Sequence, residues 1–217
     1  MKRTLIIIAL LSMGITAQSQ ITLGPRFGVN FSKQHIDSPY EVYKVGTMIG
    51  GVVNIIIKDA MAIQAELLLT QKGYKEEFDG DNTYDELTAK YLEVPVYFSY
   101  TFDFGRWKPF ANAGVYGAYL RSGSYESKIG GKEVIVEEYE FTKEYDADGF
   151  KDNRIDYGAT FGIGLLYDRV GAAGNIVLDL RYSHGLAPIS SLENPPADYQ
   201  ERTNSTFTIS LAYMFAL

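Results

Sequence analysis

The chain has 217 residues, a length that fits one domain around one closed sheet and is too short for two ordinary domains. Its 17 Tyr, 12 Phe and 21 Gly favour strands over helices, and it has no Cys with which to form disulfides. The formal charge of −7 argues against a nucleic-acid partner, which would require a basic surface.

The first residues follow the three-part pattern of a secretory signal peptide. Lys2–Arg3 gives a positive start, Leu5–Leu11 is apolar, and Ala17–Ser19 offers small residues for cleavage. The apolar run is shorter than the ~20 residues that a membrane-spanning helix needs. We therefore expect residues 1–19 to be a signal peptide and residues 20–217 to form the mature β-barrel domain. The alternative is a buried N-terminal helix or strand.

After this segment, apolar residues alternate with polar or small residues at every second position, which is typical of strands. Six segments alternate clearly: Leu23–Ser32, Ile63–Lys72, Tyr91–Phe102, Ile155–Leu165, Ile176–Ser183 and Thr206–Phe215. Two further strands are predicted from their length and flanking turns: Val45–Ile57, which is apolar on both faces, and Phe110–Leu120, whose faces are not assigned. The total of eight is even, so the last strand can pair antiparallel with the first and leave no open edge.

The connections between these strands are alternately short and long. The short ones are Lys58–Asp59, Asp103–Trp107 and Asp168–Gly174, and the longer polar ones are Lys33–Lys44, Tyr74–Thr88, Ser122–Asn153 and Ala187–Glu201. Membrane barrels show this pattern because short turns face the periplasm and long loops face outward. We predict an all-β fold: an eight-stranded antiparallel transmembrane β-barrel with short periplasmic turns and four longer outer loops.

The polarity of the two faces separates a membrane barrel from a soluble one. A soluble barrel of the lipocalin kind has an apolar interior and a polar exterior. Here one face of nearly every clear strand is continuously apolar. The other face mixes small residues with these charged ones: Arg26, Glu66, Lys72, Glu93, Asp156, Asp179 and Arg181. We therefore expect outer-membrane lipid around the barrel, with a soluble periplasmic β-domain as the alternative.

Several short segments resemble the recurring patterns of the PorT-like outer-membrane β-barrel family. They are Gln64–Leu68 with Gln71–Gly73 after it, Tyr91–Pro95 and Arg181–Leu186, and the resemblance spans Ile21–Leu217. It implies an eight-stranded barrel in the cell outer membrane. The founding member of that family is tied to a secretion system, and that role does not transfer by resemblance.

The charged residues of the inner face are the first candidate site. An unpaired charge in a narrow, poorly hydrated lumen is costly, so these side chains should pair with one another. We interpret the following residues as a structural network that plugs the barrel: Arg26, Glu66, Lys72, Glu93, Asp179 and Arg181. The competing interpretation is a proton path or a pair of catalytic carboxylates. A passive pore is not expected, because side chains fill the interior of an eight-stranded barrel.

The two histidines are the candidates for nucleophilic catalysis. His35 lies in the first outer loop, and His184 is predicted on the lipid-facing side near the outer end of the seventh strand. Ser183 is adjacent to His184, but neighbouring residues of a strand point to opposite faces. We predict no catalytic residue and no enzyme activity, with a small lipid-modifying barrel enzyme as an alternative.

The third outer loop, Ser122–Asn153, is rich in Glu and Asp, and its Val134–Val136 segment suggests strands that extend above the membrane. Asp146, Asp148 and Asp152 lie at spacings similar to those of a calcium loop, but the twelfth position is Ile155 instead of a bidentate Glu. A solvated, repulsive loop is therefore the favoured interpretation. No metal site is predicted, and calcium binding at these three aspartates is the alternative.

These observations predict a non-enzymatic integral outer-membrane protein that is structural or binds a protein partner through its extracellular loops. No cofactor and no nucleic acid is expected. An accessory subunit of a secretion or assembly machine, which would use the barrel wall or the short turns, is the alternative from a different functional class.

Overall fold

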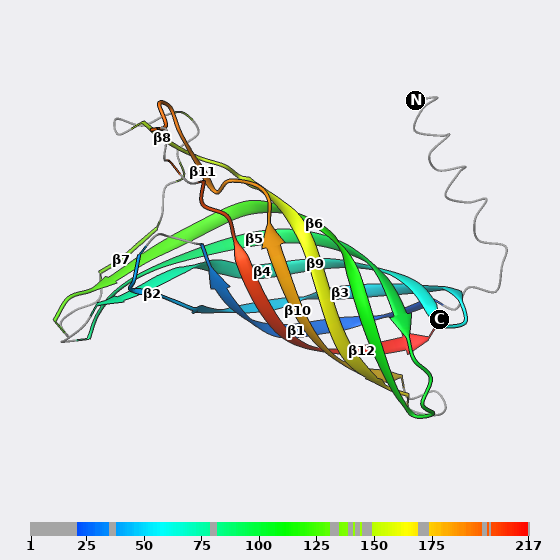
Figure 1. The fold of residues 1–217 in the computed structure, drawn as a ribbon. Coiled ribbons are helices and arrows are strands. Elements are labelled where there is room, and N and C mark those ends of the chain that lie inside the picture. The colour runs from blue at the N-terminus through cyan, green and yellow to red at the C-terminus, as the bar shows by residue number, and fades with distance from the viewer. Residues whose placement is uncertain are drawn as a thin grey trace, which may run out of the picture.

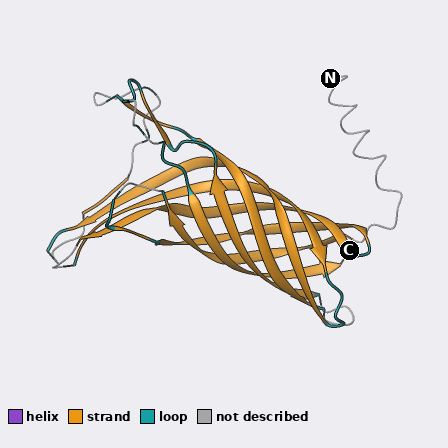
Figure 2. Ribbon diagram, in the orientation of Figure 1, coloured by secondary structure: helices purple, strands orange, loops and turns teal. Residues whose placement is uncertain are grey.

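The computed structural model describes residues 21–34, 38–78, 82–130, 135–138, 141, 144, 149–168, 174–196, 199 and 201–216. The predicted signal peptide, His35, Asp146 and Asp148 lie outside these residues. The described chain is drawn entirely as strands and connecting loops (Figure 2). Within it, no helix has the length and apolar character needed to cross a bilayer.

Eight strands close into an antiparallel ring, which confirms the predicted fold class (Figure 1). The strands are β1 (Ile21–Lys33), β3 (Lys44–Lys58), β4 (Met61–Phe78), β5 (Thr83–Thr101), β6 (Trp107–Lys128), β9 (Ile155–Tyr167), β10 (Asn175–Gly185) and β12 (Ser205–Ala216). Each pairs with the next in this order, and β1 pairs with β12, where Phe27 lies opposite Leu211. The ring therefore leaves no unpaired strand edge inside the membrane.

The strands present their apolar side chains outward and their polar ones inward. On β1, Phe27 is 54 % exposed whereas its neighbour Arg26 is fully buried. The faces of Phe110–Leu120, which the sequence left open, are now assigned. Tyr116 is buried inside the ring, and Val115 is exposed on its outer wall. An apolar exterior around a charged interior is the polarity of a barrel in lipid.

Aromatic pairs mark the two ends of the apolar band. Near the short turns the pairs are Trp107 with Tyr167, Tyr100 with Phe102, and Tyr213 with Phe215, at centroid distances of 4.5, 5.0 and 4.7 Å. Toward the other end, Phe207 packs against Tyr182 at 4.7 Å and against Tyr43 at 6.2 Å. Amphipathic rings gather at this depth because the membrane interface is apolar on one side and wet on the other.

Each of the four expected outer loops contains some strand, and in two of them the barrel strands themselves continue, so the predicted bounds of these two loops were wrong. Within Tyr74–Thr88, strand β4 continues to Phe78 and β5 resumes at Thr83, and Tyr74 pairs with Leu87. Within Ser122–Asn153, strand β6 continues to Lys128 and pairs with β5. These stretches lie in water on both faces, so their side chains lack the apolar alternation by which strands were identified.

Short strands extend this outer structure. β2 (Glu41–Val42) pairs with β4 and β7 (Ile135–Glu138) pairs with β6, so both lie beside the continuing strands. We call β2, β7 and the distal parts of β4, β5 and β6 the outer sheet. A separate arm is formed by β8 (Phe150–Asp152) and β11 (Ser190–Leu192). Figure 1 shows both at the end of the barrel opposite the C-terminus and the short turns.

Candidate functional site

Four charged side chains from three strands meet near the middle of the lumen, and we call them the central network: Arg26, Glu66, Asp179 and Arg181. The guanidinium of Arg181 binds Glu66 at 2.7 and 2.8 Å and Asp179 at 2.6 Å. Arg26 lies 3.0 Å from Asp179 and 3.2 Å from Glu66. The two cations and two carboxylates balance, so the network fills the lumen without a net charge.

Neighbouring residues make room for the central network and complete it. Gly162 lies opposite Arg181 on β9, and a Cβ there would stand 3.0 Å from Arg181 Cγ and 2.5 Å from Asn112 Oδ1. Arg181 also donates to the Tyr97 hydroxyl at 2.7 Å and stacks over that ring, 4.2 Å from its centroid. Sequence reasoning missed Tyr97, although it shares the inward face of its strand with Glu93.

A second group lies at another level of the lumen and centres on Lys72. The Lys72 ammonium is 2.7 Å from Glu93 and 3.2 Å from Asp156. Tyr116 donates its hydroxyl to Asp156 at 3.1 Å, and Asn204 donates its amide to the same carboxylate at 3.0 Å. Every carboxylate of the two groups thus has a cation partner.

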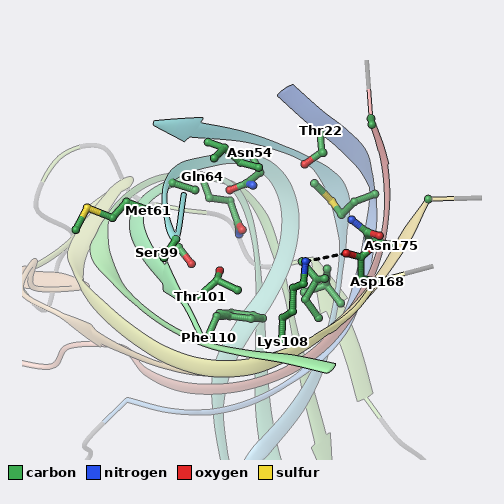
Figure 3. A pocket seen from close by; sticks show the side chains of 18 of the residues that line it. Thr22, Asn54, Met61, Gln64, Ser99, Thr101, Lys108, Phe110, Asp168 and Asn175 are labelled. Carbon is green, nitrogen blue, oxygen red and sulfur yellow. Dashed lines mark hydrogen bonds and ion pairs between the residues drawn. The ribbon is translucent and has the colours of Figure 1, made fainter. Parts of the chain in front are cut away.

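A blind pocket of about 460 Å³ opens at the end of the barrel that carries the short turns. Its neutral polar side includes Gln64, Ser99 and Thr101, which point into the space in Figure 3. Arg26 of the central network closes its inner end, and the Lys108–Asp168 ion pair of 2.8 Å lies at its side. The remaining surface includes these apolar side chains: Phe110, Leu166, Val177 and Met214.

Side-chain contacts within and between strands hold the outer sheet together. Lys75 pairs with Glu77 of the same strand at 2.6 Å. Across to β5 it lies over the Tyr84 ring, 4.7 Å from the centroid, and Tyr84 donates its hydroxyl to Glu126 of β6. On the other face, burial first and then the hydrogen bond to Asp85 raise the pKa of Tyr125 to about 12. That phenol therefore remains a hydrogen-bond donor at neutral pH.

The residues considered for catalysis do not come together. Ser183 donates its hydroxyl to Thr160, at 3.1 Å, and Thr160 is buried inside the ring. His184 is exposed on the outer wall, where its Nδ1 lies 3.5 Å from the Tyr182 hydroxyl. The wall of the barrel separates the serine from the imidazole.

Of the three calcium candidates, only Asp152 is described. It lies in β8 opposite Ser190. Asp146 and Asp148 fall outside the described residues, so calcium binding stays an untested prediction. In the described part of the chain, no group of three or more potential metal ligands of the His, Asp or Glu type is present.

The ring of strands, its apolar wall and its charged interior can now be set beside known proteins. The family model described as outer membrane protein beta-barrel domain matches residues 16–191. The chain belongs to this family. It is a small β-barrel protein of the outer membrane, in agreement with the predicted location. No curated protein matches it.

Several solved outer-membrane barrels are similar to this chain over most of their length. Neisserial surface protein A is 11 % identical, with 92 % of this chain and 99 % of that chain covered and a TM-score of 0.49. OprG from Pseudomonas aeruginosa is 12 % identical, with 91 % and 96 % covered and a TM-score of 0.47. Ail of Yersinia pestis, solved in complex with the heparin analogue sucrose octasulfate, is 12 % identical, with 91 % and 97 % covered and a TM-score of 0.41.

Proposed function

We propose that this barrel is a non-enzymatic outer-membrane protein that is closed to solutes and binds a protein partner through its outer sheet. The observation that carries the proposal is the continuation of β4, β5 and β6 beyond the lipid-facing band, with β2 and β7 along their edges. Short connections at both ends would be enough for a barrel that served only as a membrane plug. Here the connections at one end are short, whereas the other end carries an organised sheet.

The interior supports a closed barrel. The central network spans the lumen between β1, β4 and β10, and the Lys72 group adds a second layer from β4, β5 and β9. Moving a solute past these layers would break buried ion pairs, each of which costs several kcal/mol to separate. The separation of Ser183 from His184 supports the absence of catalysis, since neither residue has the geometry of a dyad.

The composition of the outer sheet supports a protein partner. Polar and charged side chains cover most of it, yet Phe78 and Val136 are 36 and 64 % exposed, and Ile129, which directly follows β6, is 67 % exposed. Apolar side chains within a polar rim are the usual anatomy of protein–protein interfaces. The cross-strand contacts of Tyr84 and Lys75 order this surface before a partner arrives, which lowers the entropic cost of binding.

The register of β4 and β5 provides a clean test of this proposal. Tyr74 lies opposite Leu87, so a two-residue Asn-Gly turn in place of Lys75–Glu86 closes the hairpin at the base of the outer sheet. In a mild-detergent pull-down from native membranes, the complete protein should retain a partner. The shortened protein should lose it while still migrating as a heat-modifiable barrel. Arg106→Gln, in a short turn at the opposite end, is the control and should retain the partner. Capture of the same partner by the shortened protein would contradict the proposal.

A second candidate function is favoured by the blind pocket. An accessory subunit of a secretion or assembly machine would dock a periplasmic segment into this space of about 460 Å³. Thr101→Trp would fill the pocket from its edge. This candidate predicts that the partner survives replacement of Lys75–Glu86 and is lost with Thr101→Trp, which is the reverse of the result expected for the outer sheet.

A further inference from the structure

Two cations stand side by side on the outer wall of the barrel. Lys90 of β5 and Arg121 of β6 are both exposed. Lys90 pairs with Ser122 whereas Tyr91 pairs with Leu120, so Arg121 is the extra residue of a β-bulge. Arg121 faces outward by the ordinary alternation of β6, in which Tyr119 is exposed and Leu120 is buried, and the bulge sets it beside Lys90.

The pair lies at the depth of lipid headgroups. The stretch from the inner aromatic Phe102, which directly follows β5, to Lys90 rises about 40 Å along the strand direction. At a strand tilt of about 40° this is about 30 Å across the bilayer, which matches the thickness of its hydrocarbon core. The outward residues between these two ends are apolar or aromatic: Leu92, Val94, Val96, Phe98 and Tyr100. Lys90 and Arg121 therefore lie where the hydrocarbon ends on the outer side.

The pair has no counter-charge from the described part of the chain. The chain holds 27 acidic and 20 basic residues, yet no ion pair between described residues includes Lys90 or Arg121. Like charges on adjacent strands repel each other. An anion between the two side chains would remove that repulsion.

A hollow on the same outer wall adjoins the pair. It has a volume of about 460 Å³ and is lined by the outward side chains Tyr119, Ile155 and Tyr157. Lys151, Asp152 and Arg154 also line it, so a carboxylate stands among these residues, and the Arg154 guanidinium lies over the Phe141 ring, 5.6 Å from its centroid. Tyr119 precedes Arg121 on the same face of β6, so the apolar hollow and the cation pair form one continuous surface.

We propose that this surface of β5, β6 and β9 binds a phosphorylated lipid of the outer leaflet. A phosphate group lies between Lys90 and Arg121, where the guanidinium donates two hydrogen bonds to it and the ammonium adds a point charge. The adjoining part of the lipid occupies the hollow beside Tyr119 and Ile155. The site is separate from the outer sheet, and its occupation does not depend on the proposed protein partner.

Lipid binding to the purified barrel tests this proposal. The probes are lipid A carrying two phosphates and its dephosphorylated form, each mixed into phosphatidylcholine nanodiscs and counted on the protein by native mass spectrometry. The variant is Lys90→Gln with Arg121→Gln. The control is Lys58→Gln with Arg106→Gln, two exposed cations at the opposite end. Each cation near a charged lipid surface is worth roughly fivefold in affinity, so the variant should bind phosphorylated lipid A roughly thirtyfold more weakly.

The control variant and the dephosphorylated lipid distinguish binding at this site from general electrostatic attraction between the protein and a charged lipid. The control should bind phosphorylated lipid A as the original protein does, and the dephosphorylated lipid should bind all three proteins equally and weakly. Inorganic phosphate at the concentration of the lipid should not displace it, because the hollow contributes apolar contact. Equal binding of phosphorylated lipid A by the variant and the original protein, or an equal loss in the control, would overturn the proposal. Heat-modifiable migration of each variant verifies that the barrel is folded.

Discussion

Strand β4 carries Lys and Glu side chains in two different surroundings, and the contrast explains how the molecule is built. Glu66 and Lys72 lie inside the lumen, almost fully buried, in ion pairs with β10, β5 and β9. Lys75 and Glu77 lie further along the strand and pair with each other in water. Inside, a charge that loses its partner has nothing to replace it, whereas outside, water replaces the partner at once.

The side chains around each set differ accordingly. Inside, Arg181 has hydrogen bonds to Glu66, Asp179 and Tyr97 at once. Outside, Lys75 has one carboxylate and one aromatic ring. The lumen is therefore the rigid part of the molecule, and the outer sheet is the part whose side chains tolerate change. A binding surface can vary there without loss of the barrel.

The largest effect is expected when a central cation is removed. Arg181→Leu leaves Glu66 and Asp179 with only Arg26 as a buried counter-charge, and we expect the free energy of unfolding to fall by about 3–5 kcal/mol. Urea unfolding in detergent micelles, followed by heat-modifiable migration, measures this change.

Arg106→Leu is the matched control, because Arg106 is exposed in a short turn and its loss should change stability by no more than about 0.5 kcal/mol. Equal unfolding midpoints for the two variants would contradict the contrast between the lumen and the water-exposed surface.

An intermediate effect is expected where the barrel passes into the outer sheet. Gly73 has a φ of +147°, and a Cβ there would lie 1.8 Å from the Leu87 carbonyl oxygen. Gly73→Ala should cost about 1–3 kcal/mol in backbone strain. It should also loosen the pairing of β4 with β5 beyond that point, so trypsin should cut the outer sheet faster.

Gly117→Ala gives the comparison, because a Cβ at Gly117 meets nothing within 4 Å. We expect its stability and its cleavage rate to stay at the original values. A similar response of both glycine variants would show that Gly73 does not set the base of the outer sheet.

The smallest effect is expected for the exposed pair. Lys75→Ala removes one ion pair and one cation–π contact in water, and we expect a loss of no more than about 1 kcal/mol. The same urea titration measures it. A loss as large as that of Arg181→Leu would mean that the outer sheet is as tightly coupled to the barrel as the lumen is.

Period-two patterning was enough to predict the ring, because lipid outside and charge inside place opposite demands on alternate residues. The pattern failed along Phe110–Leu120 since Phe110 and Leu120 are large apolar side chains that face inward. The reason lies on the neighbouring strand. A Cβ on Gly164 would stand 2.2 Å from the Phe110 ring, so glycine on β9 makes the room that Phe110 needs. One strand read alone does not contain that information.

The sequence was enough to predict which residues face the lumen, but not which of them form ion pairs with each other. The inward face identified Arg26, Glu66 and Arg181 as lumen residues. Glu66 and Arg181 are 115 positions apart on strands that are not neighbours, so their contact depends on how far each strand is shifted along the ring. Most of the outer sheet was missed for another reason, because water on both faces removes the alternation that identifies a strand. Only Val134–Val136 in the third outer loop indicated strands above the membrane, and β7 (Ile135–Glu138) lies there.

The most direct test of the whole account uses the absence of Cys from the natural sequence. Single cysteines are placed at Glu77 in the outer sheet, at Asp59 in a short turn, and at Val96 on the lipid-facing wall. A membrane-impermeant maleimide should label Glu77→Cys on intact cells and Asp59→Cys only after the outer membrane is opened. Val96→Cys should react only with a lipid-soluble reagent. Labelling of Val96→Cys by the impermeant reagent, or of Asp59→Cys on intact cells, would contradict an outer-membrane barrel that carries its sheet on the outside.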